Sequence, residues 1–208
     1  MKFPSCLSCC ILAALTLFPS FQRVAAEDAK PPPAAAPADK FAKWETEIAA
    51  MEAADLKSPP PKGEVLFIGS STIRMWKSLA QDYPEHRVIN RGFGGSEIVD
   101  ATHFAPRLVF PHAPRTIFLR SGGNDIHNGK SPEQVFADYK DFVAAIHAKL
   151  PETDIIYIGL APTLARIGEV AKGNRLNALI SVFIAASPLV AMTWSLGVRA
   201  TRLAVEIT

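Results

Sequence analysis

Residues 65–74, Val65-Leu66-Phe67-Ile68-Gly69-Ser70-Ser71-Thr72-Ile73-Arg74, decide the fold of this chain. An apolar run with β-branched residues ends in a glycine and two serines, and a segment with helical character follows. This order predicts a buried strand, a tight turn and then a helix. It places Ser71 at the carboxyl end of a strand and at the start of a helix, where open parallel α/β sheets form their binding sites.

Two later stretches follow strand-like runs in the same way: Asn90-Arg91-Gly92-Phe93-Gly94-Gly95-Ser96 and Gly122-Gly123-Asn124-Asp125. Because the carboxyl ends of parallel strands meet at one edge of a sheet, we expect all three stretches to form one hydrolytic site. The Ser71 hydroxyl could attack an ester carbonyl if a base removes its proton. Its own N–H, the Gly95 N–H and the Asn124 side-chain amide would then form a three-donor oxyanion hole.

Strand and helix patterns alternate along the rest of the chain. Further strands are expected at residues 87–90, 116–120, 155–159 and 189–193, and helices at residues 41–56, 97–108, 131–150 and 176–186. Ser131-Pro132-Glu133-Gln134 opens the third of these helices with a capping box. The first helix has an apolar stripe that we expect to pack on the domain: Phe41, Trp44, Ile48, Met51 and Leu56. The alternation predicts an α/β fold with three layers around a parallel sheet.

Composition limits the classes of function. The chain has 208 residues, of which 49% are hydrophobic and 20% charged, so it can form one domain with a sizeable core. The formal net charge is +2, and loss of Lys2 and Arg23 with an N-terminal leader would leave equal numbers of basic and acidic side chains. A neutral mature domain does not suggest binding to nucleic acid or to an anionic membrane surface.

The N-terminus has the features of a secretory signal peptide, residues 1–26. Lys2 is followed by an apolar run at 11–18, and Val24-Ala25-Ala26 offers a cleavage site. The alternative is an uncleaved membrane anchor. With cleavage we expect a secreted or periplasmic protein without stable membrane insertion, a Pro/Ala-rich linker over 27–40 and a catalytic domain over 41–208. All three cysteines lie in the leader, so the mature domain would have no thiolate metal site.

The three stretches together resemble the SGNH hydrolases, also called the GDSL-type esterase/lipase family, over about Lys40 to Ala186. The chain is similar to secreted bacterial members that carry Gly-Ser-Ser in place of Gly-Asp-Ser, and it has no Gly-x-Ser-x-Gly elbow. The resemblance implies a flavodoxin-like α/β/α sandwich and a serine esterase that needs no cofactor or metal. It makes Ser71 the nucleophile and Gly95 and Asn124 the further oxyanion positions. The implied substrates are small acyl esters, such as acetyl esters, of carbohydrate or lipid.

The sequence departs from the family near its end. The family completes its triad with an Asp-x-x-His motif, but no Asp follows Asp154 and no His follows His147. We therefore expect the domain to be truncated, with the family pattern incomplete after about residue 187. A catalytically dead binding protein for an acylated carbohydrate or lipid, and a truncated fragment, remain as alternatives to the esterase.

Another histidine could serve as the base. His127 lies three residues after Asn124 and is the candidate, and the alternative is a loop histidine that contacts substrate or solvent. His86, His103 and His112 lie in polar or Pro-flanked segments and are expected at the surface.

Overall fold

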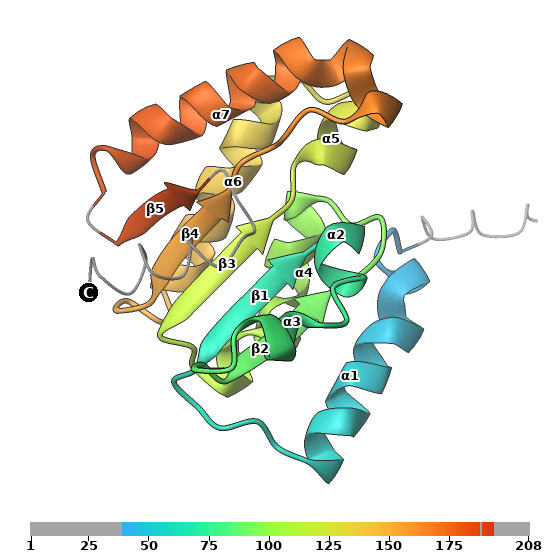
Figure 1. Ribbon diagram of the computed structural model, residues 1–208, viewed down its shortest axis with the longest axis vertical. Coiled ribbons are helices and arrows are strands. Elements are labelled where there is room, and N and C mark those ends of the chain that lie inside the picture. Colours follow the sequence, from blue (N-terminus) through green and yellow to red (C-terminus); the bar gives the residue numbers. More distant parts are fainter. Residues whose placement is uncertain (1–38, 188, 194–208) are drawn as a thin grey trace, which may run out of the picture. The chain divides into compact units, whose positions relative to one another are not determined.

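A parallel sheet of five strands forms the centre of the computed structural model, which describes residues 39–187 and 189–193 (Figure 1). The strands are β1 (Val65–Gly69), β2 (Val88–Gly92), β3 (Thr116–Arg120), β4 (Asp154–Ile158) and β5 (Val190–Thr193). Their order is β2-β1-β3-β4-β5, and every neighbouring pair is parallel. This is the flavodoxin-like order of a doubly wound α/β fold, so the predicted fold class is confirmed.

Helices lie on both faces of the sheet. The α-helices are α1 (Glu45–Lys57), α2 (Ser71–Arg74), α3 (Leu79–Asp82), α4 (Ile98–Leu108), α5 (Gly123–His127), α6 (Pro132–His147) and α7 (Val170–Ile184), and the 3-10 helices are η1 (Ala42–Trp44), η2 (Phe110–His112) and η3 (Leu164–Glu169). The larger core lies between the sheet and α1, α4, α6 and α7, and the smaller one lies under α2 and α3. Strands covered on both faces need apolar side chains at every position, and all five residues of β1 are buried.

The predicted strands agree with the observed ones to within about two residues, and the expected fifth strand is present as β5. The capping box is confirmed: the Ser131 Oγ accepts from the Gln134 N–H at 3.2 Å, and the Gln134 Oε1 accepts from the Ser131 N–H at 2.8 Å. By contrast, α7 begins at Val170, before the expected start, and the single turns of α3 and α5 were not predicted. Single turns carry too little periodicity for recognition from sequence.

Two predictions about side chains were wrong. Leu56 is 84% exposed because it lies five residues after Met51, about 140° around α1 from the buried stripe. His112 is 4% exposed, and its Nε2 lies 3.1 Å from the Arg91 Nη2 and 3.4 Å from the Asp55 Oδ2. Burial lowers the pKa of His112, and the Arg91 charge acts in the same direction. The neighbouring prolines indicate a turn. They give no sign that η2 buries the His112 ring against α1.

The expected signal peptide, most of the linker and the sequence after Thr193 lie outside the described residues. Within the described ranges, none of the helices combines the length and apolar character needed to cross a bilayer.

Candidate active site

The turn that carries Ser71 is held by close backbone contacts between three strands. Gly69 has φ +147°, and a Cβ at this position would overlap the Arg120 carbonyl oxygen, so only glycine fits. The Ser70 N–H donates to that same oxygen at 3.2 Å, and the Phe93 N–H donates to the Gly69 carbonyl at 2.9 Å. These contacts fix the direction in which the chain leaves β1 and the position of the half-buried Ser71.

Ser71 begins α2, a single helical turn, so its N–H has no acceptor within the helix. The other end of that turn is fixed by Asn90 of β2. The Asn90 Nδ2 donates to the Ile73 carbonyl at 2.7 Å, and the Asn90 Oδ1 accepts from the Gly92 N–H at 3.0 Å. The turn is therefore attached to both neighbours of β1 in the sheet, which leaves the Ser71 N–H available to an oxyanion.

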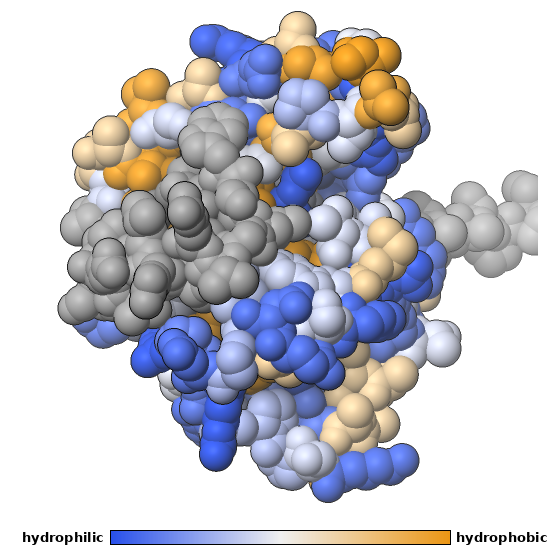
Figure 2. Space-filling model, viewed as in Figure 1, coloured by the Kyte–Doolittle hydropathy of each residue, from blue (hydrophilic) through white to orange (hydrophobic). Residues whose placement is uncertain are grey.

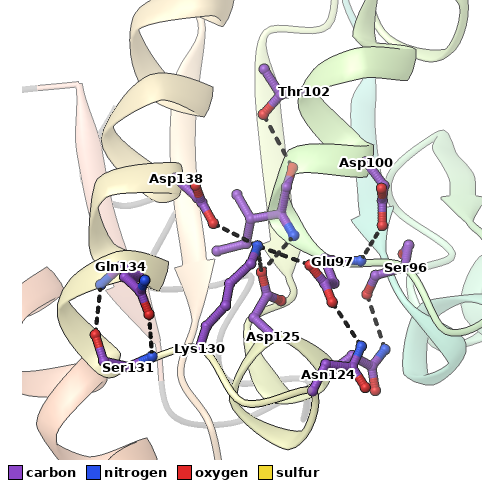
Figure 3. Close-up of polar contacts among 12 residues, drawn as sticks. Ser96, Glu97, Asp100, Thr102, Asn124, Asp125, Lys130, Ser131, Gln134 and Asp138 are labelled. Carbon is purple, nitrogen blue, oxygen red and sulfur yellow. Dashed lines mark hydrogen bonds and ion pairs between the residues drawn. The ribbon is translucent and has the colours of Figure 1, made fainter. Parts of the chain in front are cut away.

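The Asn124 side chain is held from both ends of its amide. Its Nδ2 donates to the Ser96 carbonyl at 2.9 Å (Figure 3), and its Oδ1 accepts from the Arg166 Nη2 at 2.8 Å. The amide cannot flip without losing both bonds. Since an amide NH₂ carries two hydrogens, one remains for a substrate.

A cavity of about 470 Å³ lies at this edge of the sheet and is bordered by Ser71 and Asn124. Gly95, the third predicted residue, is exposed, has φ +75° and is absent from the residues that border the cavity. It adjoins Ser96, which the Asn124 amide contacts directly. The structure thus brings two of the predicted residues to one cavity and places Gly95 in the loop beside them.

A charged cluster of Glu97, Asp125, Lys130 and Asp138 lies beside this loop (Figure 3). The Lys130 Nζ lies 2.8 Å from a Glu97 carboxylate oxygen, 2.8 Å from the Asp138 Oδ2 and 3.3 Å from the Asp125 Oδ1. The Asp125 Oδ1 also accepts from the Ile98 N–H at 3.2 Å. Burial raises the pKa of Asp125, while the Ile98 hydrogen bond and the Lys130 charge oppose that rise. The cluster connects the loop after β2 to α5, and thereby Gly95 to Asn124.

The opposite wall of the cavity consists of residues 160–173, around η3 and the start of α7. The Asn177 side chain binds both the N–H and the carbonyl of Leu160, each at 2.9 Å, and so fixes the start of this wall. Glu169 borders the cavity, and its Oε1 lies 2.7 Å from the Nδ1 of His127, a ring that is 58% exposed. Of the described residues that border the cavity, none is a histidine.

Three charged residues that border the cavity were not predicted: Arg120, Arg166 and Glu169. Arg120 directly follows an apolar strand run. A charged residue at the carboxyl end of a buried strand was the one local feature that could have indicated its place in the site. The contacts of Arg166 and Glu169 with α5 each join positions 42 residues apart, which no local pattern records. The described residues contain no group of three or more His, Cys, Asp or Glu side chains placed to hold a metal ion.

A family model for the GDSL-like lipase/acylhydrolase family matches residues 69–193, more than half of the chain, and includes all three predicted site residues. The chain belongs to this family. By family it is an ester hydrolase. No curated protein matches the sequence.

Solved structures share the fold at low sequence identity. A Streptococcus pneumonia protein named for platelet activating factor is 17% identical, with TM-score 0.59 and coverage of 73% of this chain and 75% of that chain. A GDSL-like lipase from Bacteroides thetaiotaomicron is 16% identical, with TM-score 0.54 and coverage of 73% and 76%. A catalytic mutant of Axe2, an acetylxylan esterase from Geobacillus stearothermophilus, is 15% identical, with TM-score 0.51 and coverage of 64% and 76%. At these identities the likeness shows a common fold.

Proposed function

We propose that this acylhydrolase is a serine esterase that cleaves small acyl esters, such as acetyl esters, of carbohydrates or lipids. One observation carries the proposal. Ser71, at the end of β1, and the oriented amide of Asn124, on α5, border the same cavity at the carboxyl edge of the sheet. This is the arrangement of a nucleophile and an oxyanion donor.

The reaction would proceed in two steps. The Ser71 Oγ attacks the ester carbonyl carbon and passes its proton to a base, and the carbonyl oxygen becomes an oxyanion. The Ser71 N–H and the Asn124 Nδ2 donate to that oxygen, and the Gly95 N–H of the adjoining loop is the third donor that the family resemblance implies. Collapse of the tetrahedral intermediate releases the alcohol, which takes the proton from the base. Water then hydrolyses the acyl-serine, releases the carboxylic acid and restores the hydroxyl of Ser71.

His127, whose ring does not itself border the cavity, is the candidate for the base. Its Nδ1 is 2.7 Å from the Glu169 carboxylate, which is the relation between a base and the group that orients it in hydrolytic triads. It lies on α5 one turn after Asn124, and Glu169 borders the cavity. These positions support His127 in the role that the family resemblance gives to an Asp-x-x-His histidine.

A second candidate function is binding of an acylated carbohydrate or lipid without turnover. It is favoured by the absence of histidine among the described residues that border the cavity. In that case Ser71 stays protonated, and the oxyanion donors hold the ester carbonyl only as a hydrogen-bond acceptor.

The test is hydrolysis of p-nitrophenyl acetate by the purified chain. We expect Ser71→Ala to lower kcat/KM by about a thousandfold or more and Asn124→Ala by about a hundredfold to a thousandfold. Ser58→Ala, at an exposed serine after α1, is the matched control and should keep the wild-type rate. Equal rates for the wild type and Ser71→Ala would overturn the esterase. Binding of an acetylated oligosaccharide together with such equal rates would support the second candidate.

The same assay tests the base. We expect His127→Ala to lower kcat while leaving KM within about threefold, because the ring acts on the proton rather than on substrate binding. Unchanged activity in His127→Ala would remove this ring from the mechanism and leave the nucleophile proposal intact.

The location of the protein is part of the proposal. Residues 1–26 would direct export, and the mature protein would begin at Glu27 in the periplasm or outside the cell. Mass spectrometry of exported material should find Glu27 at the N-terminus. Exported protein that still carries Met1 would contradict cleavage.

A further inference from the structure

Two arginines, Arg120 and Arg166, border the same cavity as Ser71. Arg120 is the last residue of β3 and lies in register with Gly69, two residues before the nucleophile. By strand alternation it belongs to the sheet face of Phe118, the face that α2 covers. Arg166 comes from η3 on the opposite wall, with its Nη2 2.8 Å from the Asn124 Oδ1. The two charges therefore enter the cavity from both of its walls.

The cavity contains little negative charge to compensate them. Among the described residues that border it, Glu169 is the acid, and its carboxylate is engaged by His127 at 2.7 Å. Arg120 forms no side-chain hydrogen bond or ion pair with any residue in the described ranges, although it is partly buried. Arg166 is bound to a neutral amide oxygen rather than to a carboxylate. The cavity thus has an excess of positive charge next to the nucleophile.

The electrostatic surroundings of Arg120 agree with this description. Burial lowers the pKa of Arg120, Tyr157 opposes the change, and the nearby Arg166 charge lowers the pKa further. An arginine nevertheless keeps its charge at neutral pH. Two like charges in one cavity repel each other, and an anion bound between them would offset this repulsion. A neutral acetyl group would leave the repulsion between the two arginines uncompensated.

We propose that this cavity binds an anionic oxyacid group, a carboxylate or a phosphate, carried by the ester substrate. Guanidinium groups match both groups through paired N–H donors in a planar fork. Arg120 would bind the anion with its unpartnered donors. Arg166 would contribute charge and the N–H groups that the Asn124 amide does not use. The link to turnover rests on the proposed esterase, whereas the binding of the anion does not.

The first experiment measures binding without turnover. Glutarate, inorganic phosphate and neutral glutaramide are titrated into the Ser71→Ala protein by isothermal titration calorimetry. We expect glutarate or phosphate to bind at least tenfold more tightly than glutaramide, and the preferred anion identifies the group. Arg120→Gln in the same background should weaken that binding at least tenfold. Arg175→Gln is the matched control, because Arg175 is exposed and paired with Glu133 at 3.0 Å outside the cavity.

Failure to bind either anion, or equal binding by the Arg120→Gln protein, would overturn the proposal. If the protein with both Ser71→Ala and Arg120→Gln fails to fold, the Ser71→Ala protein alone still tests the proposal, because its affinity for the anions can be compared with its affinity for glutaramide. In that protein, an increase of NaCl from 0.05 M to 0.5 M should also weaken anion binding severalfold, because salt screens the arginine charges. Binding that salt leaves unchanged would count against the two arginines.

The second experiment uses turnover. The ratio of kcat/KM for mono-p-nitrophenyl glutarate to that for p-nitrophenyl acetate should fall at least tenfold in Arg120→Gln and stay unchanged in Arg175→Gln. Anion binding without hydrolysis of either ester would support the binding site and reject the esterase. Hydrolysis of both esters with a ratio that does not depend on Arg120 would support the esterase and reject the binding site.

Discussion

The two walls of the cavity are built differently. The Ser71 wall, residues 69–75, is held mainly by backbone contacts with β2 and β3 and by the glycines Gly69 and Gly92, which other residues could not replace. The η3 wall, residues 160–173, is connected to α5 by two side-chain pairs, Arg166 with Asn124 and Glu169 with His127. It also exposes large apolar side chains, with Leu164 at 93% and Ile167 at 67% exposed. Figure 2 shows hydrophobic side chains at the surface over η3 and α7.

The difference separates two requirements of a hydrolytic site. Oxyanion donors must be held within a fraction of an ångström of the position where charge develops, which a sheet edge with close backbone packing can provide. Selection of the substrate depends on residues that can change without disturbing that geometry, and surface segments can carry such residues. On the η3 wall, the exposed Leu164 and Ile167 are residues of this kind, whereas Arg166 holds the Asn124 amide and belongs to the first requirement.

The largest expected effect is on the Ser71 wall. Gly69→Ala adds a Cβ that overlaps the Arg120 carbonyl at a φ that L-residues rarely adopt, so we expect a loss of about 3 kcal/mol or more and no esterase activity. The loss of stability is measured from thermal unfolding curves recorded by circular dichroism.

Gly63→Ala is the matched control for that substitution, because its φ is +77° but nothing lies within 4 Å of the added Cβ. Only the conformational cost remains there, about 1 kcal/mol. Equal destabilisation of the two variants would show that the close approach of β1 and β3 does not matter.

A smaller effect is expected where the loop after β2 is attached to α5. Although burial opposes it, hydrogen bonds from Asn128 and Lys130 hold the pKa of Glu97 below its ordinary value of 4.5. A lowered folded-state pKa contributes stability that is complete above 4.5 and is lost as the pH falls through the folded value. Glu97→Gln should therefore cost about 1 kcal/mol at pH 7, and this difference should shrink as the pH falls through the lowered pKa of Glu97.

Melting temperatures of the wild type and Glu97→Gln between pH 3 and pH 7 provide the measurement. Glu152→Gln, at an exposed position before β4, should show no such trend. A gap between wild type and Glu97→Gln that stays constant with pH would contradict the ion pair with Lys130.

The smallest effect is expected on the η3 wall. Leu164→Ser and Ile167→Ser remove side chains that are already in solvent, so each should change the free energy of unfolding by less than about 0.5 kcal/mol. Leu160→Ser, at a 9% exposed position on the same wall, should cost about 2 kcal/mol or more. Urea denaturation separates these cases, and a large loss for Leu164→Ser would show that the wall is packed more tightly than its exposure indicates.

Sequence reasoning was strongest where local patterns repeat. Apolar runs bounded by small residues located the strands, and the Ser131 capping box located the start of α6. It was weaker for single side chains at the end of a periodic segment or outside one, as Leu56 and His112 show. A histidine flanked by proline has no local feature that records a buried contact with Arg91 and Asp55, which lie on other elements.

The sequence by itself determined the α/β class, the parallel sheet and the positions of Ser71, Gly95 and Asn124 at strand ends, because these follow from local periodicity and turn chemistry. Only the tertiary structure decided which side chains share a cavity. Strand order brings β1 and β3 together, and the return of the chain through η3 places Arg166 on Asn124 across 42 residues. The charge of the cavity, with Arg120 and Arg166 facing a single paired acid, is a property of that long-range packing.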